Sequence, residues 1–180
     1  MTETCTLIIF GATGNLAQLK LLPALYHLEV AGLLPTGLRI VCSGRSQYSQ
    51  EAWSVRVREI LTQHARDPLS TTHCDAFDRR MHYFRAKLSQ PDTFKQLAEL
   101  LSDPRFPDNQ VFYISLPPST YGGVIESLQT RGMLVEESAW RRVVIEKPFG
   151  YDLERGRPMR TPADLMALLE AYEGRAFPPR

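Results

Sequence analysis

Apolar and polar positions follow one another along the chain in blocks that predict strands and helices in turn. Short runs that are apolar throughout indicate strands buried on both faces, and longer stretches with apolar residues three or four positions apart indicate helices. Strands are expected at residues 6–10, 38–43, 81–88, 110–115 and 141–146, the last of them buried. Helices are expected at residues 16–31, 49–64, 91–101 and 120–130.

Two stretches depart from this rhythm. Pro23 lies inside the first expected helix and should break or kink it, because proline has no N–H and its ring clashes with the preceding turn. Residues 67–80 show no hydrophobic period, so a loop is expected there.

The alternation of strands and helices predicts an α/β fold, a Rossmann-like doubly wound and mainly parallel sheet with flanking helices. Ligands of such sheets bind outside the carboxyl ends of the strands. Four of the expected strand ends carry polar or glycine residues suited to a ligand. They are residues 11–15, 44–46, 115–118 and 146–148.

The length of 180 residues indicates one domain. Residues 1–154 are assigned to this nucleotide-binding domain. Residues 155–180 form a divergent C-terminal tail, in which residues 161–172 could make a short helix.

The turn after the first strand has the pattern G-x-x-G-x-x-A. Gly11 lets the chain leave the strand in a conformation closed to side chains, and Gly14 lets the backbone approach a pyrophosphate. The following helix offers unpaired N–H groups and a positive dipole end to an anion. Ala17 is small enough for close packing of helix on strand. The pattern excludes a P-loop, because no Gly-Lys-Ser/Thr follows. Two glycines in a turn can also serve geometry alone.

The second strand ends in Gly44-Arg45-Ser46, where an NAD-specific site would carry an acidic residue for the ribose. Arg45 can pair with a 2′-phosphate and Ser46 can donate a hydrogen bond, so NADP is favoured. An arginine can also stack on the adenine of NAD, so NAD stays an alternative. A solvated loop arginine is the simplest other interpretation.

Two lysines in the sequence lie where dehydrogenases use lysine. Lys147 follows the last strand and is expected near the middle of the cleft, although a Lys-Pro turn that merely ends a strand would look the same. Tyr83 and Lys87 have the Tyr-x-x-x-Lys spacing of short-chain dehydrogenases, which requires a helix. They lie in an expected strand, so this pair is rejected.

Composition narrows the choice of partners. A formal net charge of +1 gives no reason to expect nucleic-acid or membrane binding. Three widely spaced cysteines and four scattered histidines form no disulfide or metal pattern, so no metal is expected. The N-terminal apolar run has no basic region before it and is too short to span a bilayer, which makes the cytoplasm the expected compartment.

Four segments, in this order, resemble the coenzyme domain of glucose-6-phosphate dehydrogenase over residues 5–154. They are GATGNLAQLKLLPALYHLEVAGLLP, CSGRSQYS, FYISLPPSTYGGVIESL and RRVVIEKPFGYDLE. The resemblance implies an oxidoreductase of glucose metabolism in the pentose phosphate pathway. Its reaction would oxidise the sugar phosphate at C1 to 6-phosphogluconolactone and pass a hydride to NADP.

The resemblance also implies roles for individual residues. The pyrophosphate would be held by Gly11, Ala12, Thr13, Gly14, Asn15 and Leu16, with Lys20 beside the phosphates. Arg45 would hold the 2′-phosphate, Tyr121 would line the cofactor groove, and Lys147 would contact both substrate and cofactor. Asn15 replaces the usual aspartate, and Gln18 and Leu19 occupy positions that are commonly basic.

The catalytic histidine of the family lies in an R-x-D-H-Y-x-G-K block, and nothing here matches that block. No catalytic residue is therefore assigned, and negligible dehydrogenase activity is expected of this chain alone. A truncated or frame-shifted gene and a genuinely short relative would both give this pattern. The rival hypothesis is a non-catalytic NADP-binding or interaction module, whose exposed sheet edge pairs with a second copy or another chain.

Overall fold

The computed structural model describes residues 4–90, 92–145, 151–152 and 157–158 of the chain. In this part, five parallel strands form one sheet in the order β3-β2-β1-β4-β5. Their bounds are β1 Thr6–Phe10, β2 Arg39–Gly44, β3 Met81–Arg85, β4 Gln110–Ile114 and β5 Arg141–Ile145. Two short strands, β6 (Tyr151–Asp152) and β7 (Arg157–Pro158), form a separate antiparallel pair.

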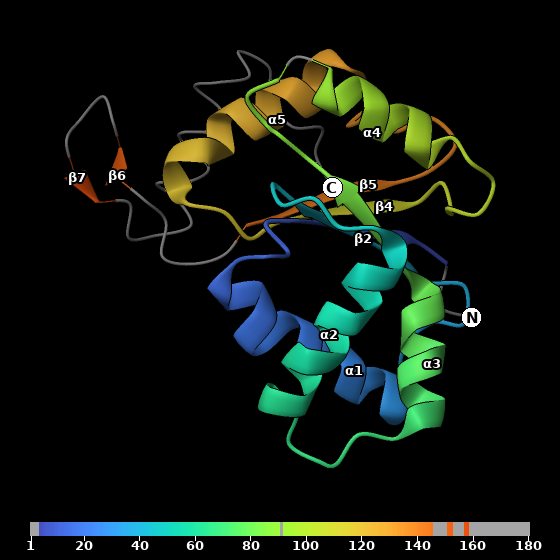
Figure 1. Ribbon diagram of the computed structural model, residues 1–180. Helices are drawn as coiled ribbons and strands as arrows, with labels where there is room; N and C mark the ends of the chain where they lie inside the picture. Colours follow the sequence, from blue (N-terminus) through green and yellow to red (C-terminus); the bar gives the residue numbers. More distant parts are fainter. Residues whose placement is uncertain (1–3, 91, 146–150, 153–156, 159–180) are drawn as a thin grey trace.

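Helices cover both faces of the sheet, as Figure 1 shows: α1, α2 and α3 lie on one side and α4 and α5 on the other. The α-helices are α1 Leu22–Val30, α2 Gln50–His64, α3 Thr71–Arg80, α4 Thr93–Leu101 and α5 Tyr121–Thr130. A π-helical turn, η1 (Ala17–Leu21), precedes α1, and a 3₁₀ turn, η2 (Pro118–Thr120), precedes α5. The predicted doubly wound α/β fold is confirmed.

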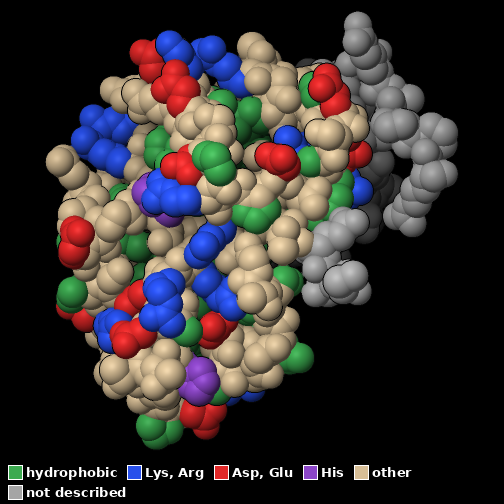
Figure 2. Space-filling view, turned by 90° about the vertical axis from the view of Figure 1, so that its right-hand side faces the viewer, with side chains coloured by type: hydrophobic (Ala, Val, Ile, Leu, Met, Phe, Trp, Pro, Cys, Tyr) green, Lys and Arg blue, Asp and Glu red, His purple; other side chains and the backbone are tan. Residues whose placement is uncertain are grey.

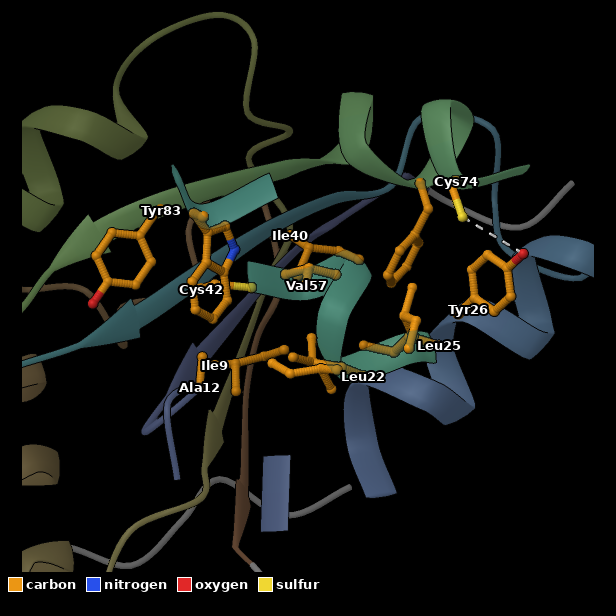
Figure 3. Packing of buried hydrophobic residues seen from close by; sticks show 14 of the residues in the cluster. Ile9, Ala12, Leu22, Leu25, Tyr26, Ile40, Cys42, Val57, Cys74 and Tyr83 are labelled. Atoms are coloured by element: carbon orange, nitrogen blue, oxygen red, sulfur yellow. Dashed lines mark hydrogen bonds between the residues drawn. The ribbon is translucent and has the colours of Figure 1, made fainter. Parts of the chain in front are cut away.

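Alternate residues of each strand supply two separate cores. The core beneath α1, α2 and α3 is shown in Figure 3, where Ile9 and Ile40 of the sheet meet Leu22 of α1 and Val57 of α2. Ile8 and Phe10 point to the other face and pack with residues of α4 and α5. Because both faces of the strand are buried, β1 has to be apolar on both faces.

Pro23 does not break the first helix. The chain widens instead into the π-turn, where the N–H of Leu22 bonds to the carbonyl of Ala17, five residues earlier. Pro23 then lies in the first turn of α1, where its missing N–H costs little. The predicted kink is thus replaced by a local change of helix type.

Residues 67–80 are not a loop as predicted, because Thr71–Arg80 form α3. Ser70 caps this helix by accepting a hydrogen bond from the N–H of His73 at 3.5 Å. Cys74 and Phe77, three residues apart, are buried against α1, and the Cys74 thiol donates to the Tyr26 hydroxyl at 3.8 Å. With only two buried positions, the helix leaves a weak apolar period in the sequence.

The prediction that the last strand is buried is also wrong. β5 pairs with β4 on one side and is the outermost strand of the described sheet. Val143 and Val144 are 36% and 39% exposed, so the apolar run reflects strand formation rather than a covered position.

The described surface carries charges of both signs. On the side of the molecule that faces the viewer in Figure 2, basic and acidic side chains are interspersed, and hydrophobic side chains form small separate patches. Within the described residues, no helix is both long enough and apolar enough to cross a membrane.

Candidate functional site

The turn after β1 is built so tightly that its first residue must be glycine. Gly11 has a φ of +87°, in the left-handed region that favours glycine. A Cβ at this position would lie 2.2 Å from the carbonyl oxygen of Ser115. The chain beyond β4 therefore runs directly against the turn, and the N–H of Ser115 also bonds to the carbonyl of Phe10 at 2.9 Å.

The end of β2 holds the other side of this turn. The N–H groups of Gly11 and Ala12 both donate to the carbonyl of Ser43, at 3.0 and 2.9 Å. The N–H of Gly14 turns back to the carbonyl of Gly11 at 2.8 Å. The backbone path of the turn is thus fixed by two neighbouring strands before any ligand binds.

Free backbone donors follow the turn. The first helical hydrogen bond runs from Gln18 to the carbonyl of Gly14 at 3.0 Å. Asn15 and Leu16 are exposed, and among the described residues their N–H groups have no backbone acceptor. N–H groups at the positive end of a helix dipole bind anions, and phosphate groups above all.

Gln18 links the turn to α2, a role that the sequence did not reveal. Its side-chain amide donates to the carbonyl of Thr13 at 2.6 Å and accepts from Arg56 at 2.9 Å. Arg56 also pairs with Glu59 at 3.0 Å. From the sequence, Gln18 is noted only as standing at a position that is commonly basic in the family. Its contact with Arg56 spans 38 positions of the sequence, which no local pattern records.

The end of β2 also touches the turn directly. A Cβ on Gly44 would lie 2.7 Å from Cγ2 of Thr13 and 2.9 Å from the hydroxyl of Tyr83. Arg45 and Ser46 come next and are both exposed. The carboxyl ends of β1, β2 and β4 therefore meet at one place, as the order of the strands predicts.

The loop that carries Arg45 is tethered to β3. The Tyr83 hydroxyl donates to the carbonyl of Ser46 at 2.7 Å. The side-chain amide of Gln50 bonds both the N–H and the carbonyl of Tyr83, each at 2.8 Å. Burial, together with neighbouring Tyr48, raises the pKa of Tyr83 to about 12, so the hydroxyl remains a donor over the physiological pH range.

The remaining predicted site residues are placed differently. Lys20 is exposed on η1, one turn beyond the glycine turn. Tyr121 is only 7% exposed and packs in the core beneath α4 and α5, and burial raises its pKa. Lys147, with the rest of residues 146–148, lies outside the described residues. Tyr83 belongs to strand β3, which agrees with rejection of the Tyr83–Lys87 pair.

Comparison with known proteins gives consistent matches. A family model described as glucose-6-phosphate dehydrogenase, NAD binding domain, matches residues 8–165. Glucose-6-phosphate 1-dehydrogenase 2 of Mycobacterium bovis is 34% identical over 160 residues, covering 86% of this chain and 31% of that protein. The glucose-6-phosphate 1-dehydrogenase of Treponema pallidum is 37% identical over 153 residues, covering 82% of this chain and 30% of its own length.

A solved structure agrees with these sequence matches. The crystal structure of glucose-6-phosphate 1-dehydrogenase from Mycobacterium avium superposes with a TM-score of 0.76 at 28% identity. The alignment covers 95% of this chain and 34% of that one. The chain thus spans about a third of the length of the relatives it matches.

Proposed function

The chain belongs to the glucose-6-phosphate dehydrogenase family through its coenzyme-binding domain, and on that premise we propose that it binds NADP at the carboxyl ends of β1, β2 and β4. The observation that carries the proposal is the turn at Gly11. It leaves no room for a side chain, and it is followed at a helix start by two exposed residues, Asn15 and Leu16, whose N–H groups have no backbone acceptor among the described residues. A turn of this kind fits a pyrophosphate.

The rest of the coenzyme follows from the order of the strands. With the pyrophosphate over residues 11–16 and Lys20 beside it, the adenosine half extends toward the end of β2. There Arg45 and Ser46 would bind the 2′-phosphate. The nicotinamide half extends toward the end of β4, with Tyr121 buried beneath that region and Lys147 as the residue proposed to meet both nicotinamide and substrate.

The reaction that this domain would serve is the oxidation of glucose 6-phosphate to 6-phosphogluconolactone, with hydride transfer to NADP. Such a step needs a base for the C1 hydroxyl proton. The four histidines of the chain all precede β5, and none lies in the short segments directly after β1, β2 and β4 that form the site. The 180-residue polypeptide by itself is therefore expected to bind coenzyme with negligible turnover. Its three free cysteines suit a reducing compartment such as the cytoplasm.

A calorimetric titration of the purified chain with NADP, and separately with NAD, tests the proposal. We expect saturable NADP binding that weakens by about 1 to 3 kcal/mol in Arg45→Ala, the scale of a lost charged hydrogen bond. Arg79→Ala is the matched control, since Arg79 is an exposed arginine in the last turn of α3. A folded chain that binds neither nucleotide would refute the proposal. Turnover of glucose 6-phosphate well above a Lys147→Ala control would refute the expected inactivity.

A second candidate function is pairing with another protein chain along β5. It is favoured by the exposure of Val143 and Val144 on the outermost strand of the described sheet. Open strand edges readily pair with other strands. Light scattering on the purified chain tests this, with Val144→Lys as the variant expected to abolish any dimer. A monomer at all concentrations would contradict self-association.

A further inference from the structure

A second arginine lies beside Arg45 at the end of the neighbouring strand. Arg85 is the last residue of β3 and pairs in register with Gly44, the residue directly before Arg45. Its Nε donates to the carbonyl of Arg45 at 3.5 Å, and its guanidinium also donates to the side chain of Gln47 at 3.3 Å. The guanidinium of Arg85 thus lies against the loop that carries Arg45.

Among the described residues, neither of these arginines has a counter-ion. In the part of the chain that the structure describes, no carboxylate forms an ion pair with Arg45 or Arg85. Arg58 and Arg80, in contrast, each pair with acidic side chains within 2.7 Å. Two positive groups at one strand end, without a negative partner, favour a multiply charged anion.

We propose that Arg85 is a second binding residue for the 2′-phosphate and, together with Arg45, determines the preference for NADP over NAD. This inference rests on the proposed coenzyme site. The end of β2 is where a doubly wound sheet holds the adenosine ribose, and β3 is the strand next to it. The planar, forked donors of arginine match the oxygens of a phosphate, whose three acceptors can serve two guanidinium groups at once.

The surrounding contacts hold the backbone of the loop and the side chain of Arg85 in position. Tyr83 and Gln50 tie the β2–α2 loop to β3 through three hydrogen bonds of 2.7 to 2.8 Å. Gln47 holds the guanidinium of Arg85 on the loop side. Little of the loop therefore has to be ordered when the phosphate binds, and a preorganised site loses less free energy on binding.

Arg85 is separate from the groups that would bind the pyrophosphate. Those groups belong to residues 11–16 after β1, whereas Arg85 lies beyond β2, two strands away in the sheet. Removing its charge should therefore affect a coenzyme with a 2′-phosphate and leave one without it almost unchanged. That difference separates a specificity residue from one that only supports the fold.

Calorimetry of the full 180-residue chain with NADP and with NAD tests the inference, using Arg85→Gln and Arg85→Lys. We expect Arg85→Gln to bind NADP about tenfold more weakly, with NAD affinity unchanged within about twofold. Arg85→Lys should recover part of the loss, because lysine keeps the charge without the fork. Arg79→Gln removes the same charge in the last turn of α3, just before β3 begins, and should change NADP affinity by less than about twofold.

Three results would overturn the inference. NADP affinity of Arg85→Gln within twofold of the parent chain would show that Arg85 does not contact the phosphate. An equal loss of affinity for NADP and NAD in Arg85→Gln would show that Arg85 has a structural role only. Arg85→Lys, which keeps the charge, is the second variant in case Arg85→Gln fails to fold. A parent chain that binds neither nucleotide would refute the proposed function as well, whereas the first two results leave that function standing.

Discussion

Substitution of Gly11 by alanine separates two physical reasons for glycine at the turn. The left-handed φ of +87° disfavours any side chain, and the Ser115 carbonyl occupies the space where a Cβ would be. Gly132 is the matched control, because its φ is +69° but no described atom lies within 4 Å of a Cβ built there. Gly132→Ala therefore introduces the backbone strain without the collision.

The magnitudes follow from these two geometries. Left-handed strain costs roughly 1 to 2 kcal/mol for a non-glycine residue, which is the whole effect expected at Gly132. At Gly11 the Cβ would start 2.2 Å from a backbone oxygen, so the turn and β4 must separate. Overpacking of that kind costs about 1 to 3 kcal/mol more. Gly11→Ala should thus lower the free energy of unfolding by about 2 to 5 kcal/mol.

Urea unfolding followed by tryptophan fluorescence, to which Trp53 contributes as a side chain only 1% exposed in the folded protein, measures both variants. NADP titration of the folded Gly11→Ala protein adds a second measurement, because separation of β1 from β4 also displaces the N–H groups of the following helix. We expect that variant to lose NADP binding, while Gly132→Ala keeps it. Equal destabilisation by the two substitutions would refute the collision argument and leave only the backbone strain.

Three other predictions concern the structure around the site. Arg80→Ala should lower the free energy of unfolding by about 3 to 5 kcal/mol, because it leaves the Glu29 carboxylate, whose side chain is 10% exposed, without its ion-pair partner at 2.7 Å. Urea unfolding measures the loss, and Arg80→Lys should recover part of it. Burial raises the pKa of Cys42 to about 12, so its thiol should react with an aromatic disulfide reagent at about pH 8 only after unfolding, and rapid labelling of the native protein at this position would contradict the structure. Burial, with the nearby charge of Arg105, lowers the pKa of His82 below 6.5, so the unfolded chain binds the proton more tightly and stability should fall as the pH drops below about 6.5. His82→Gln should flatten this part of the stability profile, and an unchanged profile would count against the assignment.

The parts of the fold that sequence predicts well are those with local causes. The strand at residues 6–10 is predicted because its residues are apolar on both faces. Its end is predicted because Gly11 allows the chain to leave the strand in a conformation that side chains disfavour. Helix α3 escapes prediction because its two buried residues leave too weak a hydrophobic period. The sequence predicts β5 to be buried because apolar composition does not show what covers a strand.

The site shows the same division. The glycine turn and the arginine after β2 are visible in the sequence, since each follows a strand end. The bonds from Gln18 to Arg56 and from Arg85 to Arg45 join residues 38 and 40 positions apart. Only the order of the strands brings such pairs together, and that order is a property of the whole chain.

The π-turn at residues 17–21 joins a helix start that faces the ligand site to α1, which packs in the core. Ahead of it, the helix start must aim its N–H groups at the ligand. After it, α1 must direct Leu22, Leu25 and Tyr26 into the core. Because a π-turn holds one residue more than an α-turn, it sets the rotational register of the helix start relative to α1. If this segment became an ordinary α-helical turn with no residue removed, the ligand end would rotate against the core end by about 100°, so the register of the two ends depends on the one extra residue that the π-turn accommodates.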